Sequence, residues 1–169
     1  MADTDTPAAA QNGAQQPVMP QIRPMAQYVR DMSFENALAQ RGLGEKVQPD
    51  VKVQVSLDAK KRDGQDDQYE VVGKFTIRSQ NKENDSALFL LELEYGGIFH
   101  VTNVKDDQLH PFLLIEAPRL MFPYIRRIVA DMTHDGGFPP LNLEPIDFVQ
   151  LYRQGLAQQK AQREAQGTA

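Results

Sequence analysis

The sequence predicts an α+β domain in which the strands come first and the helices follow. Four stretches with β-type patterning lie between residues 22 and 95, and two stretches with helical patterning follow from about residue 107. Strands and helices that are separated in this way along a chain form a sheet with the helices in a layer of their own. No repeat of solenoid length is present, so the pattern indicates a single domain.

The clearest strand pattern spans residues 50–58, where apolar and polar residues alternate without error. Two more strands are predicted at 69–78 and 86–95, and a charged hairpin loop precedes the first of them. The inward face of these three strands carries Val51, Val53, Val55, Leu57, Tyr69, Val71, Phe75, Ile77, Phe89, Leu91, Leu93 and Tyr95. The strand at 86–95 also has leucine on its opposite face.

A weaker strand is predicted at residues 22–35. Its alternation puts Tyr28, Met32 and Phe34 on one face, and Val29, Asp31, Ser33 and Glu35 on the other. The loop that follows, residues 36–49, is too long for a tight hairpin, so we expect it to cross over another element. Paired glycines at Gly96-Gly97 indicate a bulge or a close backbone approach.

The helical part of the chain is predicted to begin near Asp107. Pro118 and Pro123 cannot both fit a regular helix, because each lacks an N–H and crowds the carbonyl four residues earlier, so we expect a break or a kink. The main helix should run to about His134 and stop at Gly136-Gly137 in a left-handed turn.

Pro145 is predicted to open the last helix at its first position. The apolar stripe of that helix would consist of Ile146, Val149, Tyr152 and Leu156.

The main helix is apolar over an unusually wide arc. From Pro123 to Met132 its apolar residues cover about 140°, and about 200° if residues 120–122 belong to the same helix, whereas one core-facing stripe needs about 100°. A single small sheet cannot cover that arc. A second layer is therefore implied.

Composition limits the classes of function. The 169 residues include no cysteine, which excludes disulfides and thiolate metal sites, and the net charge of −5 argues against nucleic acid as the main partner. No apolar run approaches 18 residues and no signal-peptide pattern is present, so we expect a cytoplasmic protein that does not insert into a membrane. We expect a flexible N-terminal tail at 1–20, a folded domain at 21–157 and a flexible C-terminal tail at 158–169.

Residue patterns for catalysis are mostly missing. His100, His110 and His134 lack metal-ligand spacing, and adjacent carboxylates are better explained by a sheet edge or a helix start. We therefore expect no catalytic residue, metal or cofactor. The alternative is a small α+β ligand-binding or enzymatic domain with a pocket between sheet and helices, which needs a polar group on an inward strand face. The inward faces predicted at residues 50–58 and 86–95 offer only the Tyr95 hydroxyl.

Two surfaces are unusual. Asp31 and Glu35 share one face of their strand, as do Leu90 and Glu92, which makes an acidic face with exposed leucine unless it is an ordinary solvated face. The second surface is the loop at 138–145, which proline stiffens and which carries Phe138, Leu141 and Leu143. This loop either lines a groove for extended peptide or packs as a lid on its own core.

Six motifs resemble one family. They are Tyr28-Val-Arg-Asp-Met-Ser-Phe-Glu35, Tyr69-Glu-Val-Val72, Leu90-Leu-Glu92, Tyr95-Gly-Gly-Ile-Phe99, Glu116-Ala-Pro-Arg-Leu-Met-Phe-Pro-Tyr124 and Gly137-Phe-Pro-Pro-Leu-Asn-Leu-Glu-Pro-Ile-Asp-Phe148. Across about residues 26 to 152 the chain resembles SecB, the bacterial protein-export chaperone. The resemblance implies a four-stranded antiparallel sheet with two main helices on one face. It also implies a homotetramer, a dimer of dimers, with the helices sandwiched between outer sheets.

The resemblance also implies roles for individual residues. Unfolded preproteins would bind, without ATP, in hydrophobic grooves that contain Leu43, Val47, Phe138, Leu141 and Leu143. The SecA ATPase would dock on Asp31, Glu35, Leu90 and Glu92 and receive preproteins kept competent for translocation. The oligomer interface would involve Leu91, Leu93, Tyr95, Ile125 and Ile128. This chain departs from many family members at Val47, where they carry an aromatic, and in its glutamine-rich C-terminal tail.

Overall fold

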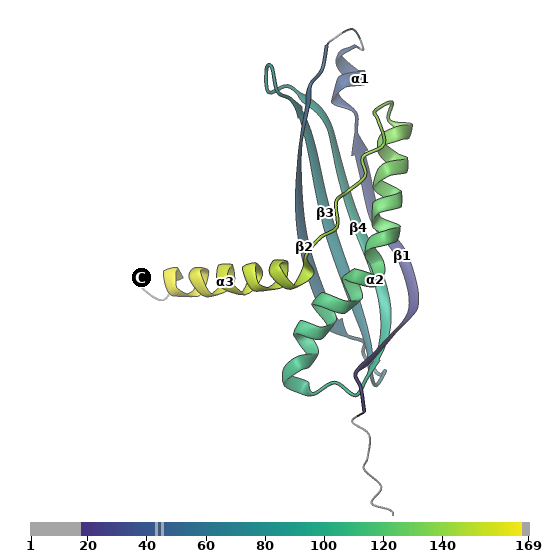
Figure 1. The fold of residues 1–169 in the computed structure, drawn as a ribbon, viewed down its shortest axis with the longest axis vertical. Coiled ribbons are helices and arrows are strands. Elements are labelled where there is room, and N and C mark those ends of the chain that lie inside the picture. Colours follow the sequence, from purple (N-terminus) through teal and green to yellow (C-terminus); the bar gives the residue numbers. More distant parts are fainter. Residues whose placement is uncertain (1–17, 43, 45, 167–169) are drawn as a thin grey trace, which may run out of the picture.

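The computed structural model describes residues 18–42, 44 and 46–166. A four-stranded antiparallel sheet has the strand order β1-β4-β3-β2 and carries helix α2 along one face, while α3 projects outward past the β2 edge (Figure 1). The strands are β1 (Gln21–Glu35), β2 (Pro49–Lys61), β3 (Gln68–Asn81) and β4 (Ala87–Thr102). The helices are α1 (Ala37–Arg41), α2 (Asp106–Asp135) and α3 (Phe148–Gln166). The predicted α+β fold, with a helix layer on one side of an antiparallel sheet, is confirmed.

The core lies between the sheet and α2. On the helix-facing side, Val53 pairs with Ile77, Ile77 pairs with Leu91, and Leu91 pairs with Phe34, so one row of apolar side chains crosses all four strands. The α2 side chains Met121, Ile125 and Val129 are buried against this face. The inward faces predicted for β2, β3 and β4 are confirmed by this register.

The residues of β1 that precede Asp31 face the opposite way from the prediction. Its register with β4 shifts between Val29 and Asp31, which leaves Arg30 as an extra residue. An extra residue reverses the alternation between the two sides of the bulge, so Val29 points toward the helices and Tyr28 points outward. The prediction that Tyr28 shares a face with Met32 was therefore wrong.

Tyr28 has a defined place on the outer face. It lies opposite Gly96, where a Cβ atom would come within 2.7 Å of the tyrosine ring, and its hydroxyl donates a hydrogen bond to Glu70. Burial, followed by this bond, raises the pKa of Tyr28 above its usual value. The close approach predicted at Gly96-Gly97 is confirmed, whereas the bulge lies on the neighbouring strand.

α2 is one helix of 30 residues with Pro111, Pro118 and Pro123 inside it. The predicted break is absent, because burial of one helix face along the sheet outweighs the lost hydrogen bonds. The predicted kink is present, since the helix changes direction part-way along (Figure 1). α2 ends as predicted, with Gly137 left-handed at φ 83°.

α3 begins at Phe148, three positions after the predicted start at Pro145. The Asp147 carboxylate accepts a hydrogen bond from the backbone N–H of Gln150 (3.0 Å), and aspartate is a preferred residue before a helix. α3 then continues through residues 158–166, which were predicted to be a flexible tail. The domain boundaries remain predictions. Residues 1–17 of the predicted N-terminal tail lie outside the described residues.

Candidate functional site

The outer face of the sheet brings the four predicted docking residues together. Glu35 of β1 pairs with Leu90 of β4, and Glu92 lies two residues further along β4 on the same side. Asp31 pairs with Glu94, which extends the carboxylate row. Asp31 and Glu35 are exposed, and Leu90 and Glu92 are partly exposed. The predicted acidic face with an accessible leucine is therefore present in the fold.

Charge is divided across this outer face. Glu94 is the one carboxylate of the row with basic neighbours, at 3.9 Å from Arg30 and 3.7 Å from Lys74. Among the residues that the structure describes, Asp31, Glu35 and Glu92 have no ion-pair partner. The exposed cations Lys52, Lys60, Lys74 and Arg78 lie on β2 and β3. The β1–β4 half of the face thus offers unneutralised negative charge to a basic partner.

The loop between α2 and α3 packs on the end of the core. The Phe138 ring lies 4.9 Å from that of Phe89, and Leu143 is almost fully buried. Phe138, Leu141 and Val47 are only partly buried, so each keeps some surface for a partner. Leu143 therefore packs as the lid interpretation predicts, and the groove interpretation stays a prediction. Leu43 lies outside the described residues.

Thr133 fixes this loop to α2, and sequence reasoning missed it. Its buried hydroxyl donates to the carbonyls of Val129 (2.9 Å) and Ala130 (3.1 Å) and accepts the backbone N–H of Leu141 (2.9 Å). Pro139 and Pro140 have no N–H, so the Leu141 amide is the first donor after Phe138. The available signal was a hydroxyl residue on the buried face of an apolar helix.

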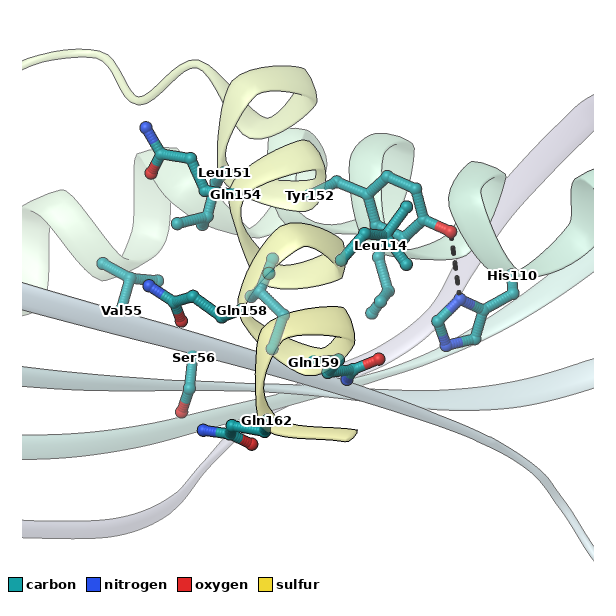
Figure 2. A pocket seen from close by; sticks show the side chains of 13 residues that line it. Val55, Ser56, His110, Leu114, Leu151, Tyr152, Gln154, Gln158, Gln159 and Gln162 are labelled. Carbon is teal, nitrogen blue, oxygen red and sulfur yellow. Dashed lines mark hydrogen bonds between the residues drawn. The ribbon is translucent and has the colours of Figure 1, made fainter. Parts of the chain in front are cut away.

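A hollow lies between β2, α2 and α3, and none of the predicted client-groove residues lines it. It has a volume of about 320 Å³, and its apolar lining includes Val55, Leu57, Leu114, Leu151 and Leu156. Four glutamines of α3, Gln154, Gln158, Gln159 and Gln162, line the rest together with Ser56, His110, Tyr152 and Gly155. Figure 2 shows the glutamines arrayed along α3, with Gln158 close to Val55 and Ser56 of β2. We name this hollow the α3 groove.

The chemistry of the α3 groove suits peptide more than catalysis. Amide side chains both donate and accept hydrogen bonds, as a peptide backbone does, and the apolar lining accepts side chains of many shapes. His110 Nδ1 lies 3.5 Å from the Tyr152 hydroxyl, which joins α2 to α3 at one end (Figure 2). The lining contains no carboxylate, so a carboxylate pair of the kind used in acid–base catalysis is absent from it.

Apolar side chains remain exposed beside the core. Val29 and Met32 of β1 are 45% and 37% exposed, and Leu120 and Tyr124 of α2 are 38% and 49% exposed. Burial raises the pKa of Tyr95, the pairing partner of Val29, and the nearby Tyr124 raises it further. We name these four residues the open strip.

Most of the residues predicted for an oligomer interface are buried within the chain. Leu91, Leu93, Tyr95 and Ile125 are buried within the single chain, and Ile128 is partly buried. A buried side chain has little surface left to contact a second copy. Leu91, Leu93, Tyr95 and Ile125 would therefore affect assembly indirectly, by holding the neighbouring exposed residues in position. Their role in assembly stays a prediction.

Comparison with known proteins identifies the family. The model of the family described as "Preprotein translocase subunit SecB" matches residues 14–159. The chain belongs to the SecB family. A relative from Cereibacter sphaeroides named "Protein-export protein SecB" is 62% identical over 160 residues, covering 92% of this chain and 96% of the relative. The SecB relative of Ruegeria pomeroyi is 56% identical over 169 residues, covering 100% and 99% of the two chains.

A solved structure agrees with the SecB fold. It is a SecB-like chaperone from Mycobacterium tuberculosis in complex with a peptide from an antitoxin, with a TM-score of 0.60 at 16% identity, covering 75% of this chain and 90% of that chain. SecB proteins are protein-export chaperones and not enzymes, so the enzymatic alternative is set aside. Within residues 18–42, 44 and 46–166, no helix has the length and apolarity to cross a membrane.

Proposed function

We propose that this SecB-family chain is an ATP-independent chaperone of the cytoplasm that binds unfolded preproteins and delivers them to the SecA ATPase. The observation that carries the proposal is the α3 groove, where apolar side chains and glutamine amides face the same space. An extended segment with apolar side chains would be desolvated there without a unique hydrogen-bond pattern. The peptide held by the SecB-like chaperone of similar fold supports this kind of ligand.

Binding of this kind keeps a client unfolded by mass action. A protein that binds the unfolded chain and not the native one lowers the concentration of free unfolded chain, which slows folding and aggregation. Client choice would depend on how long a preprotein stays unfolded. The loop residues Phe138, Leu141 and Leu143, with Val47 and Leu43 of the crossover, would form a second part of the client surface.

Calorimetry with a slow-folding, destabilised preprotein tests client binding. We expect sub-micromolar affinity for the unfolded preprotein and no binding to its native form, and equal binding of the two forms would refute the proposal. Gly155→Phe should fill the α3 groove, because no atom lies within 4 Å of a Cβ at Gly155. Arg153→Phe is the matched control on α3, since Arg153 is exposed outside the groove.

SecA would dock on the acidic half of the outer face. Asp31, Glu35 and Glu92 carry charge that no neighbouring cation neutralises among the described residues, and Leu90 lies between two of them. Glu92→Lys should weaken SecA association and spare client binding. Asp58→Lys is the control, with the same charge change on the β2 half of the same face. Equal SecA affinity for wild type and Glu92→Lys would contradict this docking site.

The open strip supports a homotetramer, a dimer of dimers with helices between outer sheets. Apolar side chains of α2 and β1 that are a third to a half exposed gain free energy when a second copy covers them. Leu91, Leu93, Tyr95, Ile125 and Ile128 would keep the neighbouring core in shape for that contact. Light scattering that gives a stable monomer at micromolar concentration would exclude this assembly.

A further inference from the structure

A buried asparagine joins the end of the crossover loop to the hairpin between β3 and β4. Asn81 is only 1% exposed and lies at the end of β3, where it pairs with Pro49 of β2. Its side-chain amide donates a hydrogen bond to the carbonyl of Lys46 (3.3 Å) and accepts one from the backbone N–H of Gln48 (3.1 Å). These two backbone groups lie on either side of Val47. One side chain therefore holds the backbone around a residue of the proposed client surface.

The burial of this polar side chain has a physical reason in those two bonds. A buried amide costs free energy unless its hydrogen bonds are made, and an apolar residue of similar size would fill the same space without that cost. The local bond from the backbone N–H of Glu83 to Asn81 Oδ1 (3.3 Å) is a turn contact that an exposed asparagine also makes. The bonds to Lys46 and Gln48 span 35 and 33 positions of the chain, so they fix the loop to the sheet.

Asn81 is itself held firmly by its own main chain. Its N–H donates to the carbonyl of Ser86 and its carbonyl accepts the N–H of Asp85, both at 2.8 Å, which closes the hairpin. The next residue, Lys82, donates its N–H to the carbonyl of Gln48 (2.8 Å). The end of the crossover loop thus rests on a closed hairpin.

The start of the crossover loop is fixed by another asparagine. Asn36 Oδ1 accepts the N–H of Ala39 (2.9 Å) at the start of α1, and Asn36 Nδ2 donates to the carbonyl of Gly136 (2.7 Å) at the end of α2. The first attachment therefore lies beside the loop at 138–145, and the second, at Asn81, lies beside Val47. Val47 also packs against the core and is only partly buried.

We propose that Asn81 is a positioning residue for client binding, whose side-chain amide holds Val47 in the place where an unfolded preprotein contacts it. Asn81 is too deeply buried to touch the client, so it acts through the backbone of Lys46 and Gln48. Without the amide, the end of the loop would have to be ordered when the client binds, and the entropy of that ordering opposes binding. This inference rests on the client binding proposed above.

Asn81→Leu tests the role, because leucine has about the same size and cannot make the three bonds. Calorimetry with an unfolded preprotein, under conditions where the variant is fully folded, should give about three- to tenfold weaker binding. Asn81→Asp keeps the acceptor for the Gln48 N–H and loses the donor to Lys46, so its affinity should lie between those of wild type and Asn81→Leu. It also keeps the test available if Asn81→Leu does not fold. A purely structural residue would change stability alone, so wild-type affinity in both variants would overturn the proposal.

Ser86→Ala is the matched control in the same hairpin. The Ser86 hydroxyl is buried without a hydrogen-bond partner in the described part of the chain, and the substitution keeps the carbonyl that accepts the Asn81 N–H. Ser86→Ala should bind preprotein as wild type does. Hydrogen exchange gives a second reading, since the Gln48 amide should lose protection in Asn81→Leu and keep it in Ser86→Ala.

Two results separate failure of this role from failure of the proposed function. If wild type binds the unfolded preprotein and Asn81→Leu binds it equally well, the positioning role is overturned and client binding stands. If wild type itself does not bind the preprotein, the proposed function falls and this inference falls with it. Unchanged protection of the Gln48 amide in Asn81→Leu would also overturn the positioning role, whatever the client does.

Discussion

Thr133→Val is the perturbation whose size the structure defines best. Valine has nearly the shape of threonine, so the substitution removes the hydroxyl without opening a cavity. The helix carbonyls of Val129 and Ala130 keep their own helical donors, whereas the backbone N–H of Leu141 loses its acceptor at 2.9 Å. An amide left without a partner costs about 1 to 3 kcal/mol, which is the expected loss in free energy of unfolding.

Thr133→Ser is the matched control, because it keeps the hydroxyl and deletes one buried methyl group. That deletion costs about 1 kcal/mol, so global stability does not separate the two variants well. Hydrogen exchange does separate them. The Leu141 amide should lose its protection in Thr133→Val and keep it in Thr133→Ser, and the signal is clean because Pro139 and Pro140 have no amide hydrogen.

The loosened loop should also bind clients less well, since Phe138 and Leu141 would no longer be held on the core. Calorimetry with an unfolded preprotein should therefore show weaker binding for Thr133→Val than for Thr133→Ser. Unchanged protection of the Leu141 amide in Thr133→Val would refute this account of the loop.

Three further predictions concern the core, the outer face and assembly. Gly97→Ala should lower the free energy of unfolding in urea by about 1 to 3 kcal/mol, because the added Cβ would lie 2.5 Å from the ring of the fully buried Phe99. A variant as stable as wild type would count against this packing. Since burial and the Glu70 bond raise the folded-state pKa of Tyr28 above 10.0, its stabilising contribution is complete below pH 10.0 and disappears as pH rises through the folded-state value. Tyr28→Phe should thus lose less stability above pH 10.0 than wild type, and parallel profiles would disprove this linkage. Tyr124→Arg should lower the assembled mass in sedimentation, and full retention of that mass would remove the open strip from the interface.

Alternation predicted all four strands, and it assigned the faces of three of them correctly because their pairing has few irregularities. In β2 every second residue from Val51 to Leu57 is apolar and faces the helices, as the register with β3 requires. β1 failed at Tyr28 and Val29, because the extra residue Arg30 exists only in the pairing with β4 and leaves no mark in the pattern of β1 itself. Sequence periodicity reflects the residues of a single strand, whereas a bulge depends on how two strands pair.

The candidate site was predictable where its residues share one strand face. The common face of Asp31 and Glu35 follows from the alternation of β1, because no bulge lies between them, and the face of Glu92 follows from the alternation of β4. The α3 groove was missed because it combines residues of β2, α2 and α3 that are far apart in the sequence, some of them after the predicted end of the last helix near residue 157. Thr133 was missed because its partner, the Leu141 amide, meets it only after the chain has turned at Gly137.

The central claim is that this chain leaves more apolar surface uncovered than one copy can hide, and uses it for assembly and for binding unfolded chains. Light scattering of the purified protein, alone and with an unfolded preprotein, tests both uses at once. We predict a mass of about four times the 19.0 kDa chain that increases when the preprotein is added, with aggregation of the preprotein suppressed. A 19.0 kDa particle that leaves the preprotein to aggregate would contradict the claim.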